Sequence, residues 1–198
     1  MNIIVKPYGS NLCYCRPDTT WERENKDFYS PECVNDIYWT PVVFAHVSKA
    51  GKCVGRKFVE RYYDAVGCGM LLFCGTSTTS FEGSAGVRGL SEVVDRSSIL
   101  PHPLFLPVVL EGEKEFIVSC QHEAQGDAAL SHNIILCGAK DLLEEALCNA
   151  SQLTSLRIGD FVAVELKELQ KLVSREEGDI AVKGEFCEKE IFGFNIVF

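Results

Sequence analysis

The sequence has no long run of apolar residues. The first such stretch, Ile3 to Val5, is ended by Lys6 and Pro7, and no later segment approaches the roughly 18 apolar residues of a membrane span. This absence argues against a signal-peptide core and a membrane-spanning helix. We therefore expect a soluble, cytoplasmic protein with no membrane partner.

Blocks of basic residues are also absent. The 28 acidic residues outnumber the 19 basic ones and give a net charge of −9. The long-range field of such a chain repels phosphate backbones and anionic lipid. We therefore expect no nucleic-acid partner.

Ten cysteines in a short secreted chain would suggest a disulfide scaffold, but their positions here do not favour one. Most of them lie within apolar runs, where cysteine behaves as a small hydrophobic residue. These are Cys13, Cys15, Cys68, Cys74, Cys120 and Cys137. We predict reduced thiols in the core. A cysteine nucleophile at Cys74 or Cys120, paired with a histidine, is a further alternative, although thiols in apolar strands are usually inert.

Four potential zinc ligands lie near one another in the sequence. They are Cys120, His122, His132 and Cys137. Zinc accepts thiolate and imidazole ligands in a tetrahedral set, but Cys-x-x-Cys and His-x-x-x-His pairs are lacking here. A zinc site is therefore the alternative, and a polar loop between two strands is the simpler interpretation.

Short segments of β-type composition recur along the chain, separated by turn glycines. They span residues 3–5, 12–15, 41–47, 66–74, 116–120, 133–137, 161–164, 180–186 and 191–198. Apolar residues at helical spacing predict helices over 55–65 and 141–153. The charged tract 165–177 is interpreted as a solvated face or turn region. The pattern predicts one β-rich α+β domain over residues 1–198.

Several motifs occur in the order typical of one family. They are Arg16-Pro17-Asp18-Thr19, Asn35-Asp36-Ile37-Tyr38-Trp39, Lys57-Phe58, Tyr62-Tyr63-Asp64, Val66-Gly67-Cys68-Gly69, Phe81-Glu82-Gly83-Ser84 and Ile158-Gly159-Asp160. In this order the chain, from Leu12 onward, resembles the fumarylacetoacetate hydrolase superfamily, including its acylpyruvase members. The resemblance implies a mixed β-roll with one or two short helices, a homodimer, and a hydrolase that uses Mg²⁺ or Ca²⁺.

The family's cation site does not carry over. The family places two glutamates two residues apart on one strand, so that both face the same side, and an aspartate on the next strand. These positions correspond to Thr40, Val42 and Leu71. Because Mg²⁺ and Ca²⁺ need hard oxygen ligands, we expect no cofactor here. Cys74 and Thr79, the latter at the family's lysine position, complete the predicted ancestral pocket.

Other catalytic parts are missing as well. The lid that carries a general-base pair in the family is reduced to Lys6–Ser10, and Val164–Lys167 replaces the substrate loop. The preferred hypothesis is a non-catalytic relative with a structural or small-ligand-binding role. The alternative is a diverged hydrolase that cleaves a carbon–carbon bond in a β-diketo or acylpyruvate substrate. A third possibility is an interaction subunit that docks through Pro101–Pro107.

Overall fold

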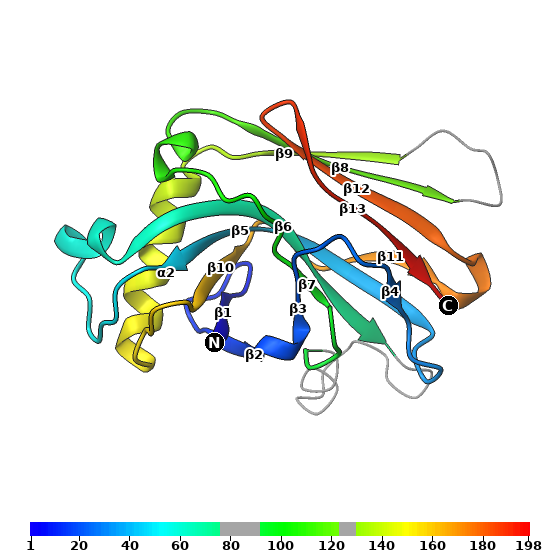
Figure 1. Ribbon diagram of the computed structural model, residues 1–198, viewed down its shortest axis with the longest axis horizontal. Helices are drawn as coiled ribbons and strands as arrows, with labels where there is room; N and C mark the ends of the chain where they lie inside the picture. The colour runs from blue at the N-terminus through cyan, green and yellow to red at the C-terminus, as the bar shows by residue number, and fades with distance from the viewer. Residues whose placement is uncertain (76–91, 123–129) are drawn as a thin grey trace.

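Two β-sheets and one long helix make up the computed structural model, which describes residues 1–75, 92–122 and 130–198 (Figure 1). The strands are β1 (Asn2–Lys6), β2 (Tyr14–Pro17), β3 (Trp21–Glu22), β4 (Phe28–Tyr29), β5 (Asp36–Val47), β6 (Tyr63–Gly75), β7 (Ser98–Ile99), β8 (Glu115–His122), β9 (Leu130–Ile135), β10 (Phe161–Glu165), β11 (Gln170–Ser174), β12 (Ile180–Phe186) and β13 (Lys189–Val197). The helix is α2 (Ala139–Leu153), and the 3₁₀ segments are η1 (Asp18–Thr20), η2 (Arg56–Arg61), η3 (Pro107–Leu110) and η4 (Arg175–Glu177).

The larger sheet has eight strands in the order β2-β1-β10-β5-β6-β7-β3, with β11 also paired to β5. The smaller sheet has five strands in the order β4-β13-β12-β8-β9. In the larger sheet β1 runs parallel to β10, whereas β5 is antiparallel to both β10 and β6. The long strands β5 and β6 therefore form the centre of this sheet.

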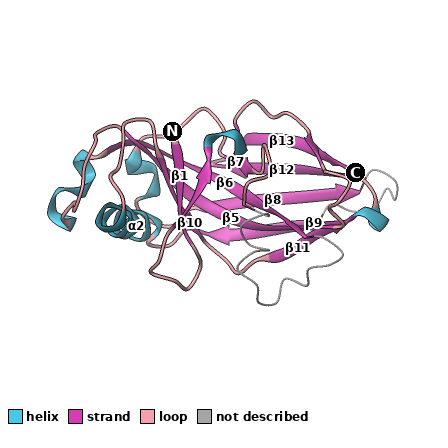
Figure 2. Ribbon diagram, turned by 90° about the horizontal axis from the view of Figure 1, so that it is seen from below, coloured by secondary structure: helices cyan, strands magenta, loops and turns pink. Residues whose placement is uncertain are grey.

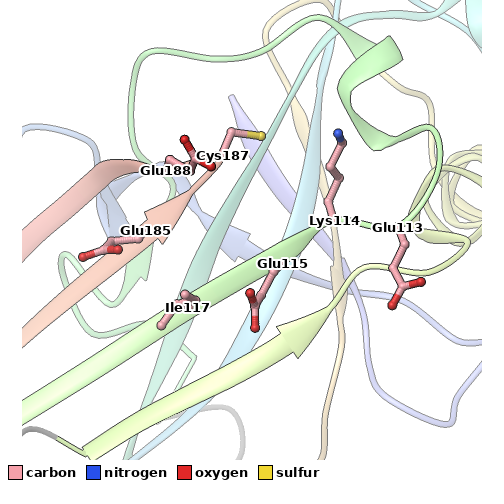
Figure 3. Close-up of a pocket in the computed structure, with 7 residues that line it drawn as sticks. All are labelled: Glu113, Lys114, Glu115, Ile117, Glu185, Cys187 and Glu188. Carbon is pink, nitrogen blue, oxygen red and sulfur yellow. The ribbon is translucent and has the colours of Figure 1, made fainter.

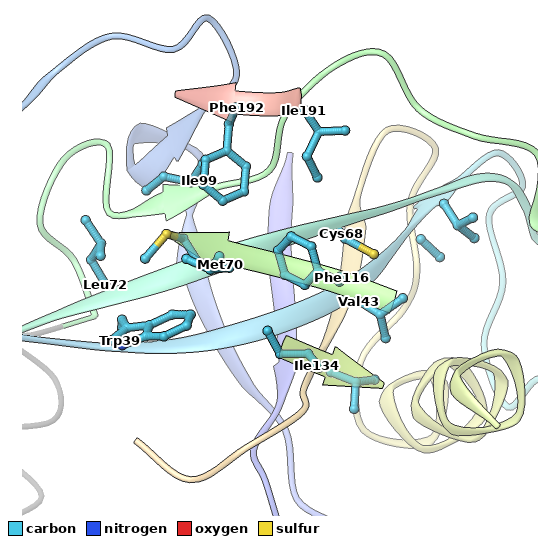
Figure 4. Close-up of a cluster of buried hydrophobic side chains, with 14 of the residues drawn as sticks. Trp39, Val43, Cys68, Met70, Leu72, Ile99, Phe116, Ile134, Ile191 and Phe192 are labelled. Atoms are coloured by element: carbon cyan, nitrogen blue, oxygen red, sulfur yellow. The ribbon is translucent and has the colours of Figure 1, made fainter. Parts of the chain in front are cut away.

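The larger sheet has apolar side chains on both faces. Its inner face meets the smaller sheet and α2 in the inner core, where Trp39, Val43 and Leu72 pack with Phe116 and Phe192 (Figure 4). Its other face carries a second buried group, which we call the outer cluster. The outer cluster comprises Ile3, Val5, Val42, Phe44, Leu71, Phe73, Leu100, Phe161 and Ala163.

The helix predicted over 141–153 is confirmed as α2, which lies beside the ends of the strands in Figure 2. It begins after Gly138, whose φ of 68° suits a glycine. One side of the helix, with Leu143, Ala146 and Leu147, is buried in the inner core. The amphipathic spacing read from the sequence thus identifies the packed face.

The helix predicted over 55–65 is wrong. Only η2 is helical there, and Tyr63 already begins β6, where it pairs with Val47. Phe58 is exposed, so the periodic stripe does not pack as a helix face would. The long pairing between β5 and β6 decides the structure of this segment.

The interpretation of residues 165–177 as a solvated face or turn region holds only in part, because most of these residues are exposed or half-buried but five of them form a strand. Residues Gln170–Ser174 form β11, which pairs with β5, and Val173 is fully buried. Ser174 and Glu177 then form a capping box at the start of η4. Charged side chains on the exposed face of an edge strand hide such a strand from sequence inspection.

Cys68, Cys74 and Cys120 are buried, as predicted, whereas Cys15 and Cys137 are exposed, so the prediction fails for these two. Cys15 lies on the edge strand β2, and Cys137 lies just after the end of β9, so neither thiol is covered by other elements.

The segment Pro101–Pro107 crosses the larger sheet rather than standing free of it. Phe105 pairs with Val66 and packs edge-on against Phe186, while Leu106 is 71% exposed. Within the described part of the chain, no helix is long and apolar enough to cross a bilayer.

Candidate functional site

Three side chains that the sequence predicts at the family's ligand positions lie side by side on the outer face of the larger sheet. Leu71 of β6 is directly opposite Thr40 of β5, and Val42 follows two residues along β5. Since residues two apart on a strand point to the same side, all three side chains face the outer cluster. Each has an exposed fraction of 0%. The position is therefore closely packed and carries no carboxylate.

Cys74 does not join this group. Leu71 and Phe73 belong to the outer cluster, whereas Leu72 and Cys74 belong to the inner core, so Cys74 points to the opposite face. Burial raises the pKa of the Cys74 thiol to about 12, which keeps it protonated at neutral pH. Thr79 lies outside the described residues. The structure thus brings together Thr40, Val42 and Leu71, but not Cys74.

A buried guanidinium lies on the same face. Arg16 of β2 has an exposed fraction of 0%. Its Nη1 donates to Ser97 O at 3.2 Å, and its Nη2 donates to Leu72 O at 3.0 Å. The guanidinium carbon lies 4.3 Å from the centre of the Phe73 ring. Ser98, which Nη1 contacts at 3.4 Å, pairs with Leu71, so a permanent positive charge is held on the face that carries Leu71.

A tyrosine and a glutamate form a polar group at one end of this face. Glu165 ends β10 directly opposite Val42. The Tyr14 hydroxyl donates to Glu165 Oε1 at 2.8 Å, and the Tyr8 amide donates to Oε2 at 3.1 Å. Burial raises the pKa of Tyr14 well above its usual value, Arg16 opposes the rise, and Glu165 adds to it. Tyr14 is therefore a neutral hydrogen-bond donor at physiological pH.

Hydroxyl groups on this face are used to hold the fold. Thr40 Oγ1 donates to Lys167 O at 2.8 Å, and the Thr20 and Ser98 hydroxyls share a hydrogen bond of 2.9 Å. A divalent ion needs several hard oxygen ligands, with carboxylates to offset its lost hydration. Neither these hydroxyls nor the guanidinium of Arg16 meets that need, and Glu165 is a single carboxylate bonded to Tyr14 and Tyr8, so the described residues of this face do not fit a divalent cation.

The four residues of the zinc alternative are spread along the smaller sheet. Cys120 and His122 lie at one end of β8, whereas Cys137 follows the strand pair at its other end. His132 packs edge-on against Trp39, with ring centres 5.2 Å apart. Burial raises the pKa of the Cys120 thiol to about 12. Over residues 1–75, 92–122 and 130–198, no group of three or more His, Cys, Asp or Glu residues is placed to hold a metal.

A separate hollow of about 630 Å³ opens at the edge of the smaller sheet (Figure 3). Its lining residues are Glu113, Lys114, Glu115, Ile117, Glu185, Cys187 and Glu188. They come from the start of β8 and from the β12–β13 turn, so the hollow is distinct from the outer face of the larger sheet. Its walls are mainly acidic.

The two-sheet arrangement has counterparts among solved structures. A protein assigned to the fumarylacetoacetate hydrolase family from Yersinia pestis CO92 matches with a TM-score of 0.74 and 12% identity, over 99% of this chain and 92% of that one. This chain has the fumarylacetoacetate hydrolase fold. No protein-family model and no curated protein matches the sequence.

Two hydrolases show the same fumarylacetoacetate hydrolase fold. Fumarylpyruvate hydrolase from Pseudomonas aeruginosa, in complex with Mn²⁺ and pyruvate, matches with a TM-score of 0.72 and 13% identity, over 100% of this chain and 90% of that one. Maleylpyruvate hydrolase from Sphingobium sp. SYK-6 matches with a TM-score of 0.71 and 12% identity, over 99% and 70%. The β-rich fold expected from the order of the motifs is therefore confirmed.

Sequence inspection missed the polar residues on the outer face. Arg16 was noted only as part of a motif, and Tyr14 and Glu165 were not singled out. A spacing of two from Phe161 and Ala163 could have assigned Glu165 to this face. The position of Arg16 depends on pairing between distant strands, for which the sequence gives no local signal.

Proposed function

We propose that this protein is a non-catalytic relative of the fumarylacetoacetate hydrolase enzymes, with a structural or small-ligand-binding role. The observation that carries the proposal is the packing of Thr40, Val42 and Leu71, each with an exposed fraction of 0%. A metal-dependent hydrolase polarises its substrate through a bound cation. A doubly charged ion would lose its water here without carboxylates in exchange, and it would meet the positive charge of Arg16.

Calorimetric titration of Mn²⁺ and Mg²⁺ into the purified protein, after treatment with a chelator, tests this proposal. We expect only weak, non-saturating heats. A crystal soaked in Mn²⁺ should show no anomalous density between Thr40 and Leu71. Micromolar, saturable binding together with density at this position would overturn the proposal.

The second candidate is a diverged hydrolase acting on acylpyruvates or other β-diketo acids. The observation that favours it is Glu165, a carboxylate directly opposite Val42, whose partner Tyr14 can donate a hydrogen bond. This candidate predicts Mg²⁺-dependent hydrolysis of acylpyruvate that Glu165→Gln abolishes. The non-catalytic proposal predicts no turnover above the buffer rate in either protein.

We also propose a homodimer as the assembled form, in keeping with the resemblance described from the sequence. Sedimentation equilibrium distinguishes a 22.0 kDa monomer from a species of twice that mass. A single monomeric species at all concentrations would exclude the dimer.

A further inference from the structure

We propose that Arg16 is the core of an anion site that binds a small planar carboxylate, such as formate or acetate. The proposal rests on the ligand-binding role suggested above. The site is formed by the N–H donors of Arg16 that have no partner among the described residues. It lies behind Ser97 and Ser98, next to Leu72 and the ring of Phe73.

The hydrogen bonds of Arg16 leave part of its guanidinium unused. Nη1 contacts Ser97 O, Ser97 Oγ and Ser98 Oγ at 3.2, 3.2 and 3.4 Å, and Nη2 donates to Leu72 O at 3.0 Å. Nε is buried and has no hydrogen-bond partner among the described residues. Since a guanidinium has five N–H donors, the Nε donor and one donor of Nη2 remain. A carboxylate can pair with two such donors at once.

Among the described residues, the charge of Arg16 has no direct counter-ion. None of the ion pairs between described residues involves it. Glu165, the carboxylate at the end of this face, instead accepts hydrogen bonds from the Tyr14 hydroxyl and the Tyr8 amide. A buried charge with only neutral acceptors is unfavourable, and an anion that pairs with it recovers this free energy. The same charge that disfavours a metal ion therefore favours a carboxylate.

The serine contacts set the route and the size of the ligand. Arg16 is fully buried, so an anion that pairs with Nε and Nη2 must displace the segment around Ser97 and Ser98, which contacts Nη1. These contacts are long and neutral, whereas charge-assisted bonds are shorter and roughly twice as strong. Ser97 is itself buried, and the exposed Arg96 directly precedes it in the chain. Such a position admits an anion of a few atoms and excludes an extended ligand.

Nuclear magnetic resonance of the arginine Nε–Hε groups tests the proposal directly. Sodium formate is titrated into the ¹⁵N-labelled wild-type protein at constant ionic strength, with chloride replaced by formate. We expect one signal to shift saturably and to be missing in Arg16→Lys. The exposed Arg23 provides the matched control, because Arg23→Lys should leave the shifting signal in place. No saturable shift, or a shift that persists in Arg16→Lys, would overturn the proposal.

A second variant keeps the test valid if Arg16→Lys does not fold. Ser97→Ala removes a hydroxyl that competes for Nη1, so it should tighten formate binding several-fold. Unchanged or weaker binding would contradict the proposed route. The outcome is independent of the Mn²⁺ titration, because a protein that binds neither ion refutes the anion site alone, and one that binds Mn²⁺ refutes the non-catalytic role.

Discussion

The two faces of the larger sheet differ in chemistry although the same strands supply both. The inner face, with Val43 and Leu72, is covered by the smaller sheet and α2. The outer face sets Val42 and Leu71 beside a buried guanidinium and buried hydroxyls. Alternation along β5 and β6 sends neighbouring residues into these two environments. One face thus provides packing, while the other combines packing with buried polar groups.

The largest expected effect is the difference in stability between a carboxylate placed on the outer face of the larger sheet and one placed on its inner face. Leu72→Glu places a charge in the inner core, where the described cluster is apolar, so the variant should be strongly destabilised. Leu71→Glu places the charge opposite Ser98, which Arg16 contacts, so the two charges can pair. Leu71→Glu should therefore be more stable than Leu72→Glu by about 2 kcal/mol or more in urea denaturation. Equal loss in both variants would show that Arg16 cannot pair there.

The free energy of unfolding should depend on pH because of the buried thiols of the inner face. The pKa of Cys74 and of Cys120 is raised by burial to about 12. Their contribution to stability is complete below the unfolded-state pKa of 9.0 and is lost as the pH rises towards 12. Between pH 9 and pH 11, stability should fall by roughly 2 kcal/mol for each thiol. Cys120→Ala should flatten the slope, and Cys137→Ala at an exposed site should not; equal slopes would refute the assignment.

A smaller loss of stability should follow from removing the Thr40 hydroxyl on the outer face. Thr40→Val keeps the shape of the side chain but removes the donor to Lys167 O. Leaving this carbonyl without its partner should cost about 1 kcal/mol of unfolding free energy. Thr40→Ser keeps the donor and is the matched control. If both variants lose the same amount, the methyl group rather than the hydrogen bond is responsible.

The last prediction concerns the exposure of the cysteine thiols and involves no change in stability. A thiol reagent at neutral pH should label the exposed Cys33, Cys53 and Cys187 quickly. The buried Cys68 and Cys120 should react only after unfolding. Mass spectrometry of the labelled peptides gives the order. Rapid labelling of Cys120 in the folded protein would contradict its place in the inner core.

The sequence predicts those parts of the fold whose signal is local. Alternating or continuous apolar residues mark most strands, and α2 is evident from the spacing of Leu143 and Leu147. The segment after Gly55 was misjudged because long-range pairing of Tyr63 with Val47 overrides local periodicity. β11 is not evident from the sequence because Val173 is its one buried residue and its exposed residues, Gln170 and Lys171, are polar.

The residues of the candidate site likewise fall into those that the sequence predicts and those that it does not. The grouping of Thr40 and Val42 follows from strand alternation alone, and the motif order correctly indicates the fold of the strands around them. The placement of Arg16 follows from contacts that span 56 and 81 residues of chain, with Leu72 and Ser97. No local pattern encodes such contacts, so the buried charge becomes visible only in the folded chain.

The pairing of β1 with β10 has a consequence for the order of synthesis. Ile3 lies opposite Phe161, and the amide of Asn2 donates to Asp160 Oδ1 at 2.8 Å, across 158 residues. On the ribosome, β1 therefore waits for most of the chain before its partner strand emerges, with its isoleucines and valine uncovered in the meantime. Contacts between residues so far apart in the sequence slow folding and prolong the exposure of aggregation-prone apolar segments. The nascent chain should thus depend on chaperones until residues near 165 have left the exit tunnel.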